Sequence, residues 1–376
     1  MVNDCLLKQL KIDESTAIEG GIIEQNEGRC TGLLIDNAMN PVFEALPSYS
    51  ESEMVEAVLE IQEELFQYGI TGVHEAGIQF KDISFFKKMI ANKSLKIELY
   101  AMLFPSEENI QFARKNGKYK FKNLSIQSFK VLGDGALGSR GACLKHPYSD
   151  RPGHFGVLTT SFVRMQEIAQ ICEETGYQMN VHAIGDSTNR LVLDLMEKMY
   201  EIKRDHRWRI EHAQILSPSD IVRLSTSGAF PSVQPTHAVS DQRWVSERIG
   251  TNRLAGAYAY QSILNQTGII ALGTDFPVES MNPFLTIHAA VQRKNSENLP
   301  SSGFLSKEAI SLQDCLKGMT IWAAFAAFEE TRLGSLEPTK TANFVVLENP
   351  LKATSTFQEN FAFMTFINGK KVYSAE

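Results

Sequence analysis

Short apolar runs alternate with longer amphipathic segments over most of this chain. In residues 50–68 apolar side chains recur at helical spacing, acidic residues occupy the first turn and Gly69 follows, which predicts a helix. Further helices are predicted at 162–175, at 189–200 and from Ser217, where a serine cap precedes a first-turn proline. The apolar runs between them predict seven strands, at 70–76, 96–104, 125–132, 177–183, 208–212, 229–234 and 269–273.

Repeated strand–helix alternation predicts an α/β fold with a parallel sheet and right-handed crossovers. The long glycine-rich segment between residues 132 and 177 follows a strand, so we expect a substrate or lid loop there. After Pro283 the alternation loosens. A helix is predicted at 311–328, followed by two β stretches with turns at Glu337-Pro338 and Asn368-Gly369, which indicate part of a small β-domain.

Composition narrows the classes of function. The formal charge of −7 is spread along the 376 residues, which argues against a nucleic-acid partner. Five cysteines without a CxxC pair favour neither a disulfide framework nor a zinc finger, and they fit a reducing compartment. No apolar stretch has the length of a membrane span, and the N-terminus is too charged for a secretory signal. We therefore expect a soluble, cytoplasmic protein without a membrane partner; a homo-oligomer is left open.

Four polar residues lie at or near the ends of predicted strands: Lys130 in SFKVLGDG, His182 in MNVHAIGD, His212 in RIEHAQ and Asp275 in GTDFPV. In a parallel α/β barrel the carboxyl ends of the strands converge on one mouth. Imidazole is the commonest side-chain ligand for zinc, and a carboxylate there can bind a metal and act as general base. The sequence therefore predicts a metal site formed by these four residues.

Each of the four residues also has a simpler interpretation. A buried Lys130 would tend to lose its proton, and the neutral amine can take up carbon dioxide as a carbamate. Alternatively, the Lys130 side chain extends its ammonium group to solvent or pairs with Asp134. A single strand-end histidine is more often a hydrogen-bonded core residue than a ligand. Asp275 could cap a helix or order a loop, and Asp134 or Asp186 could take either of its roles.

Three further residues are candidate substrate contacts. His237, in SVQPTHAVSD, lies just past a predicted strand. Arg140, in the long loop, could bind a carboxylate through two parallel hydrogen bonds or face solvent. His74, in VHEAG, ends the first predicted strand, where a structural role is an equal alternative.

Ordered segments along nearly the whole chain resemble the amidohydrolase superfamily, most closely its YtcJ-like (amidohydrolase 3) branch. They include GGIIEQNEGRCTGLLIDNAM, GITGVHEAG, FKVLGDGALGSRGACL, VHAIGD, RIEHAQILSPSDI, SVQPTHAVSD, GTDFPVESMNPF and GSLEPTKTANFVVL. The resemblance implies a distorted (β/α)8 barrel with a β-sandwich assembled from both chain ends. It also implies one or two divalent ions, with zinc expected, and hydrolysis of carbon–nitrogen bonds other than peptide bonds in a small amide-type substrate.

The resemblance assigns a role to each of the four residues. Lys130 matches the family's carboxylated lysine, His182 and His212 match two histidine ligands, and Asp275 matches the aspartate after strand eight, which is also the catalytic proton acceptor. The family's first strand carries a His-x-His pair, whereas no His-x-His occurs in this sequence.

We therefore expect the barrel to lack its first strand. Residues 1–48 would be an insertion before the barrel, 49–330 the barrel and 331–376 part of the β-domain. A truncated product, a second polypeptide that supplies the missing part, and a non-catalytic binding or assembly module are the alternatives. A deaminase or a cyclic amidase is a further alternative within the same superfamily.

Overall fold

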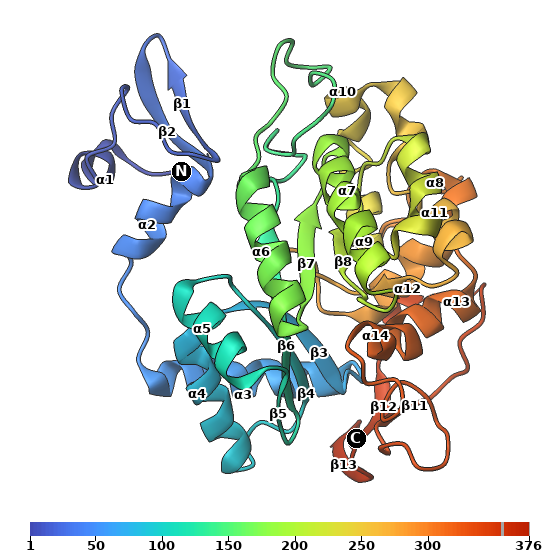
Figure 1. Cartoon of the computed structure of the whole chain (residues 1–376). Coiled ribbons are helices and arrows are strands. Elements are labelled where there is room, and N and C mark those ends of the chain that lie inside the picture. Colours follow the sequence, from blue (N-terminus) through green and yellow to red (C-terminus); the bar gives the residue numbers. More distant parts are fainter. Residues whose placement is uncertain (355–356, 376) are drawn as a thin grey trace.

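The computed structural model describes residues 1–354 and 357–375, and a curled parallel sheet forms its centre (Figure 1). Within the described residues the sheet order is β3-β4-β6-β7-β8-β9-β10, and the short β5 pairs antiparallel with β6. The strands are β3 (Gly72–Ile78), β4 (Glu98–Leu103), β5 (Tyr119–Phe121), β6 (Leu124–Leu132), β7 (Gln178–Ala183), β8 (Arg209–His212), β9 (Phe230–Val233) and β10 (Ala271–Leu272). The seven predicted strands are confirmed.

The sheet is open. Among the described strands, β3 and β10 each have a hydrogen-bonded neighbour on one side only. This arrangement confirms the predicted α/β fold, with parallel strands in an open, barrel-like sheet. The expectation that β3 ends at His74 is wrong, because Glu75 and Ile78 continue to pair with β4.

Helices connect the strands, and most of them lie around the sheet (Figure 1). They are α3 (Glu51–Gln67), α4 (Phe80–Ala91), α5 (Glu107–Asn116), α6 (Phe162–Thr175), α7 (Asp186–Ile202), α8 (Pro218–Ser227), α9 (Pro235–Asp241), α10 (Val245–Ile249), α11 (Tyr260–Thr267) and α12 (Pro283–Gln292). Ser50 begins α3 with a complete capping box, and α6 ends at the left-handed Gly176 as its sequence predicts. None of the described helices combines the length and apolar character needed to cross a membrane.

The single helix predicted at 311–328 is wrong. The segment forms two helices, α13 (Leu312–Met319) and α14 (Ile321–Ala326), separated by Thr320 at φ −126°, ψ −92°. Gly318 lies so close to β10 that a Cβ there would be 2.7 Å from Leu272. The break turns α14 so that the Ala326 carbonyl accepts hydrogen bonds from Gln178 and Arg209 inside the barrel.

Residues 1–48 form a small unit beside the barrel (Figure 1). It contains α1 (Asp4–Gln9), the antiparallel hairpin of β1 (Gly21–Asn26) and β2 (Arg29–Asp36), and α2 (Asn40–Ala45). Its own apolar core consists of Leu7, Ile12, Leu34 and Ala38. Asp36 contacts the long loop after β6, where a Cβ on Gly135 or Gly141 would come within 2.2 Å of its carboxylate.

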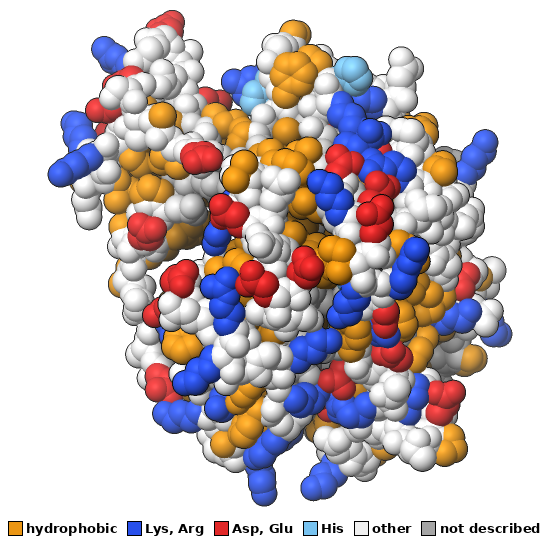
Figure 2. Space-filling model, viewed as in Figure 1, with side chains coloured by type: hydrophobic (Ala, Val, Ile, Leu, Met, Phe, Trp, Pro, Cys, Tyr) orange, Lys and Arg blue, Asp and Glu red, His pale blue; other side chains and the backbone are white. Residues whose placement is uncertain are grey.

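The C-terminal residues form a second, antiparallel sheet of β11 (Phe344–Leu347), β12 (Ala362–Ile367) and β13 (Lys370–Ser374). The predicted β stretches are confirmed, and the Asn368-Gly369 turn has positive φ at both residues, as a tight hairpin requires. The Thr365 hydroxyl donates to the Phe66 carbonyl and joins this sheet to α3. On the molecular face of Figure 2, basic and acidic side chains are interspersed.

Candidate metal centre

The structure brings His182 and His212 together at the carboxyl ends of β7 and β8. In the sheet register Ala183 pairs with His212, and the two imidazole rings lie with their centroids 4.5 Å apart. Lys130 lies on the neighbouring β6, two residues before Leu132, which pairs with His182. Three of the four predicted ligands thus occupy three adjacent strands.

Asp275 reaches the same cluster from the loop after β10. Its Oδ2 lies 3.2 Å from Nε2 of His237, and the His237 ring centroid lies 5.8 Å from that of His212. His212, His237 and Asp275 each offer one potential ligand atom, and these three atoms all lie within 4.8 Å of one another. The cluster therefore includes His237, which was predicted only as a substrate contact.

The backbone at two of these strand ends adopts the left-handed conformation. His212 has φ 74°, the following Ala213 has φ 42° and Asp275 has φ 57°. Residues other than glycine rarely adopt this conformation, which costs on the order of 1–3 kcal/mol and occurs most often at functional sites. Hydrogen bonds from Tyr258 to the Gln214 carbonyl and from Gln214 to the Tyr258 hydroxyl help to hold the turn after β8.

Burial keeps the two central histidines neutral. It lowers the pKa of His182 to about 3 and the pKa of His212 well below its usual value. Burial also lowers the pKa of Lys130, although the nearby carboxylates of Glu211 and Asp275 oppose the shift. Within the described residues, His182 Nε2 and His212 Nδ1 are buried without a hydrogen-bond partner; Asp134 Oδ1 lies 3.7 Å from His182 Nε2, beyond hydrogen-bond distance. Unpaired nitrogens on neutral imidazoles are what a divalent ion requires of its ligands, so these residues fit a metal.

His237 lies between two carboxylates. Its Nδ1 is 3.2 Å from Glu279 Oε1, and the same oxygen accepts a hydrogen bond of 2.6 Å from the Ser240 hydroxyl. Burial lowers the pKa of His237, but the hydrogen bonds with Asp275 and Glu279 outweigh this effect and raise it to about 9. Sequence reasoning missed Glu279; the available signal was a second carboxylate in the GTDFPVES segment.

Asp134 and Asp186, the alternatives to Asp275, have other partners. Asp134 accepts hydrogen bonds from the backbone of Cys143, Ile184 and Gly185 and from the Thr188 hydroxyl, at 2.8–3.0 Å. Burial raises the pKa of this carboxyl to about 7, although all four donors lower it. Asp186 accepts from the backbone of Lys145. Both carboxylates join the long loop to the start of α7.

The long loop after β6 is packed against the barrel: Leu137, Leu144 and Tyr148 belong to the main apolar core. Arg140 in this loop pairs with Asp150 through two hydrogen bonds of 3.2 and 2.9 Å. The structure does not bring Arg140 into the histidine cluster. Its contact with a substrate, and the role of the loop as a lid, remain predictions.

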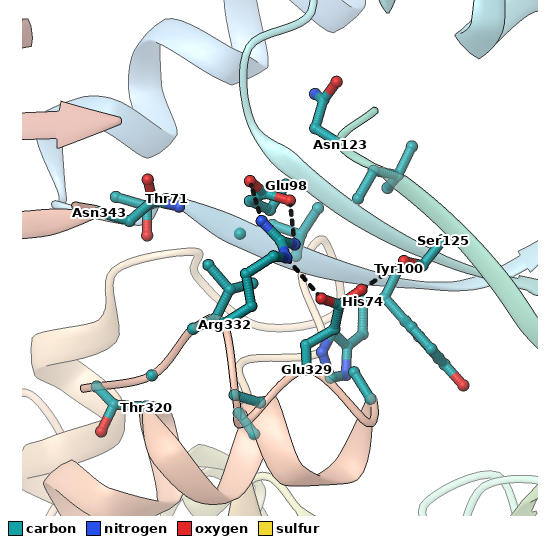
Figure 3. Close-up of a pocket in the computed structure, with 18 of the residues that line it drawn as sticks. Thr71, His74, Glu98, Tyr100, Asn123, Ser125, Thr320, Glu329, Arg332 and Asn343 are labelled. Carbon is teal, nitrogen blue, oxygen red and sulfur yellow. Dashed lines mark hydrogen bonds and ion pairs between the residues drawn. The ribbon is translucent and has the colours of Figure 1, made fainter. Parts of the chain in front are cut away.

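His74 lies apart from the cluster, where its Nδ1 is 3.0 Å from the Arg209 guanidinium. It lines a cavity of about 310 Å³ near the amino ends of β3, β4 and β6 (Figure 3). Arg332 in this cavity pairs with Glu98 and Glu329, and Lys120 also pairs with Glu329. The role of His74 as a substrate contact likewise remains a prediction.

An open α/β barrel with histidines and a carboxylate at the carboxyl ends of its strands has the architecture of the metal-dependent hydrolase class. The model described as "Amidohydrolase family" matches residues 1–373, and the chain therefore belongs to that family. The resemblance inferred from the sequence motifs is confirmed.

Two relatives and one solved structure illustrate the match. The chain is 30% identical to Protein LONG AFTER FAR-RED 3 of Arabidopsis thaliana, over 95% of this chain and 64% of that protein. It is 29% identical to the putative amidohydrolase YtcJ of Bacillus subtilis (strain 168), over 99% of this chain and 72% of that protein. The crystal structure of an uncharacterized metal-dependent hydrolase from Pyrococcus horikoshii OT3 superposes with a TM-score of 0.78, at 24% identity, over 95% of this chain and 71% of that chain. The chain thus spans less than two thirds of the length of the Arabidopsis protein.

Proposed function

We propose that this protein is a metal-dependent hydrolase that cleaves carbon–nitrogen bonds other than peptide bonds in small amide-type substrates, of the N-acyl or N-formyl type. The observation that carries the proposal is the pair of neutral histidines, His182 and His212, each with one buried, unpaired ring nitrogen, near Lys130 and Asp275. The amidohydrolase name of the Bacillus relative supports the reaction class. With five free cysteines, we also place the protein in the cytoplasm.

Lys130, His182, His212 and Asp275 would hold one or two divalent ions, with zinc as our proposal. Such an ion supplies Lewis-acid polarisation of the scissile carbonyl and makes a water molecule more acidic. The lowered pKa of Lys130 favours a neutral amine, which can form an N–C bond with carbon dioxide and release one proton to give a carbamate.

Asp275 is the proposed proton carrier. Its side chain is 34% exposed, so it reaches both the cluster and an incoming substrate. It would accept a proton from the attacking water and donate it to the leaving nitrogen. His237, whose Nε2 lies 3.2 Å from its Oδ2, would hold the carboxylate in place.

A non-catalytic binding or assembly module is the second candidate. The observation that favours it is the sequence itself, in which no His-x-His pair occurs to complete the family's ligand set. A deaminase or cyclic amidase would use the same residues and differs from the first proposal only in substrate.

Hydrolysis by purified protein tests the proposal. We expect zinc-supplemented protein to hydrolyse members of a panel of N-acyl and N-formyl amines, with release of the amine as the readout. Lys130→Ala should abolish turnover, whereas Lys115→Ala, at an exposed lysine, should leave it unchanged. A folded protein that turns over no compound in the panel would favour the non-catalytic module, and turnover that survives Lys130→Ala would contradict the assigned site.

A further inference from the structure

Three side chains of the cluster come together although only two of them, His212 and Asp275, align with the family's ligands. His212 ends β8, whereas His237 and Asp275 follow β9 and β10, and the potential ligand atoms of all three lie within 4.8 Å of one another. His237 has no place among the four ligands that the family resemblance assigns. All three residues belong to this chain, so their site is independent of a His-x-His strand.

The surroundings of His237 are typical of a metal ligand. A histidine bound to a metal usually donates the N–H of its other ring nitrogen to a carboxylate. His237 Nδ1 lies 3.2 Å from Glu279, and Ser240 holds that carboxylate with a 2.6 Å hydrogen bond. This contact directs Nε2 towards Asp275.

The spacing also suits a small ion. Zinc–nitrogen and zinc–oxygen bonds of about 2.0–2.1 Å in a tetrahedron place neighbouring ligand atoms roughly 3.3 Å apart. The distance of 3.2 Å between His237 Nε2 and Asp275 Oδ2 is close to this value. His212 needs an approach of at most about 1.5 Å.

A proton shared by His237 and Asp275 is the simpler explanation for their contact. It leaves the buried Nδ1 of His212 without a partner, however, and a buried unpaired polar atom costs about 1–3 kcal/mol. A cation among the three side chains would satisfy His212, His237 and Asp275 together.

We propose that His212, His237 and Asp275 bind one divalent transition ion by themselves, with Glu279 and Ser240 as residues that position His237. This inference goes beyond the proposed function, because an ion held here requires neither Lys130 nor turnover. It gives His237 the role of a ligand in place of the substrate contact predicted from the sequence.

Zinc titration of chelator-stripped protein tests the inference. We expect isothermal titration calorimetry to show one tight Zn²⁺ equivalent in the wild type and in Lys130→Ala. His237→Ala should weaken binding at least about 100-fold, and Glu279→Gln should weaken it by about 10–100-fold, as loss of an orienting carboxylate does. His146→Ala, at an exposed histidine, is the matched control and should leave the affinity unchanged.

Circular dichroism establishes that each variant is folded, and His237→Gln replaces His237→Ala if the alanine variant is not. Tight zinc that is retained in His237→Ala but lost in Lys130→Ala would place the ion between Lys130 and His182. That result overturns this inference and leaves the proposed hydrolase intact. A folded wild type that binds no zinc also overturns the inference.

Discussion

Alkaline pH should destabilise the metal-free protein in part through His237. An isolated histidine has a pKa near 6.5, and its contacts with Asp275 and Glu279 raise that of His237 to about 9 in the folded state. The folded protein therefore binds this proton more tightly than the unfolded chain does. The resulting stabilisation is fully present below pH 6.5 and is lost as the pH rises through 9.

The size of the effect follows from the two pKa values. The raised value exceeds the ordinary value by about 2.5 units, and each unit corresponds to about 1.36 kcal/mol, which together give roughly 3 kcal/mol. The His237 side chain is only 12% exposed, so solvent screening reduces this figure little. Because domains are typically stable by about 5–15 kcal/mol, the loss is measurable.

Urea unfolding of chelator-treated protein between pH 6.5 and 9.5 measures this loss. The wild type should be more stable than His237→Gln at pH 6.5, by roughly 3 kcal/mol, and the two free energies should converge by pH 9.5. Subtraction of the two curves removes other titrating groups such as Asp134, whose pKa burial raises to about 7. His146→Gln, at an exposed histidine, should run parallel to the wild type.

A constant difference between wild type and His237→Gln over this pH range would refute the reasoning. It would mean that His237 carries no additional proton between the two carboxylates. The 3.2 Å contacts with Asp275 and Glu279 would then be hydrogen bonds of a neutral ring.

Two further predictions concern the long loop after β6. Asp134→Ala leaves four buried donors without an acceptor and should cost roughly 3–5 kcal/mol in urea unfolding; a cost below 1 kcal/mol would contradict this account. Gly135→Ala places a Cβ within 2.2 Å of the Asp36 carboxylate and should loosen the contact of residues 1–48 with the barrel, measured as faster amide hydrogen exchange in that unit. Combining it with Asp36→Ala should restore slow exchange, and failure to do so would place the clash elsewhere.

The parts of the fold that repeat could be predicted from the sequence. Seven buried apolar runs identified seven parallel strands, because both faces of such strands are covered. Strand-end position then brought Lys130, His182 and His212 together, since parallel strands in register place their carboxyl ends at one edge. Neither inference needed knowledge of the loops.

The missed features depend on contacts between distant segments. Glu279 contacts His237 and Ser240, which lie 42 and 39 residues before it in the sequence. No sequence spacing predicts a contact between segments so far apart. The break at Thr320 has a similar origin. Helical periodicity identifies the apolar face of a helix, but it does not identify the residue at which the chain changes direction to pack a second helix against the barrel.

The two polar regions of the barrel differ in how their groups are satisfied. In the cavity of about 310 Å³ near the amino ends of the strands, Arg332 is paired with Glu98 and Glu329 is paired with Lys120 (Figure 3). At the carboxyl ends, one ring nitrogen of each histidine, His182 Nε2 and His212 Nδ1, is buried and unpaired. Paired charges stabilise the junction between the barrel and the segment around Arg332, whereas unpaired ring nitrogens lower stability unless a ligand occupies them. A ligand that pairs with these ring nitrogens would therefore stabilise the protein by satisfying them.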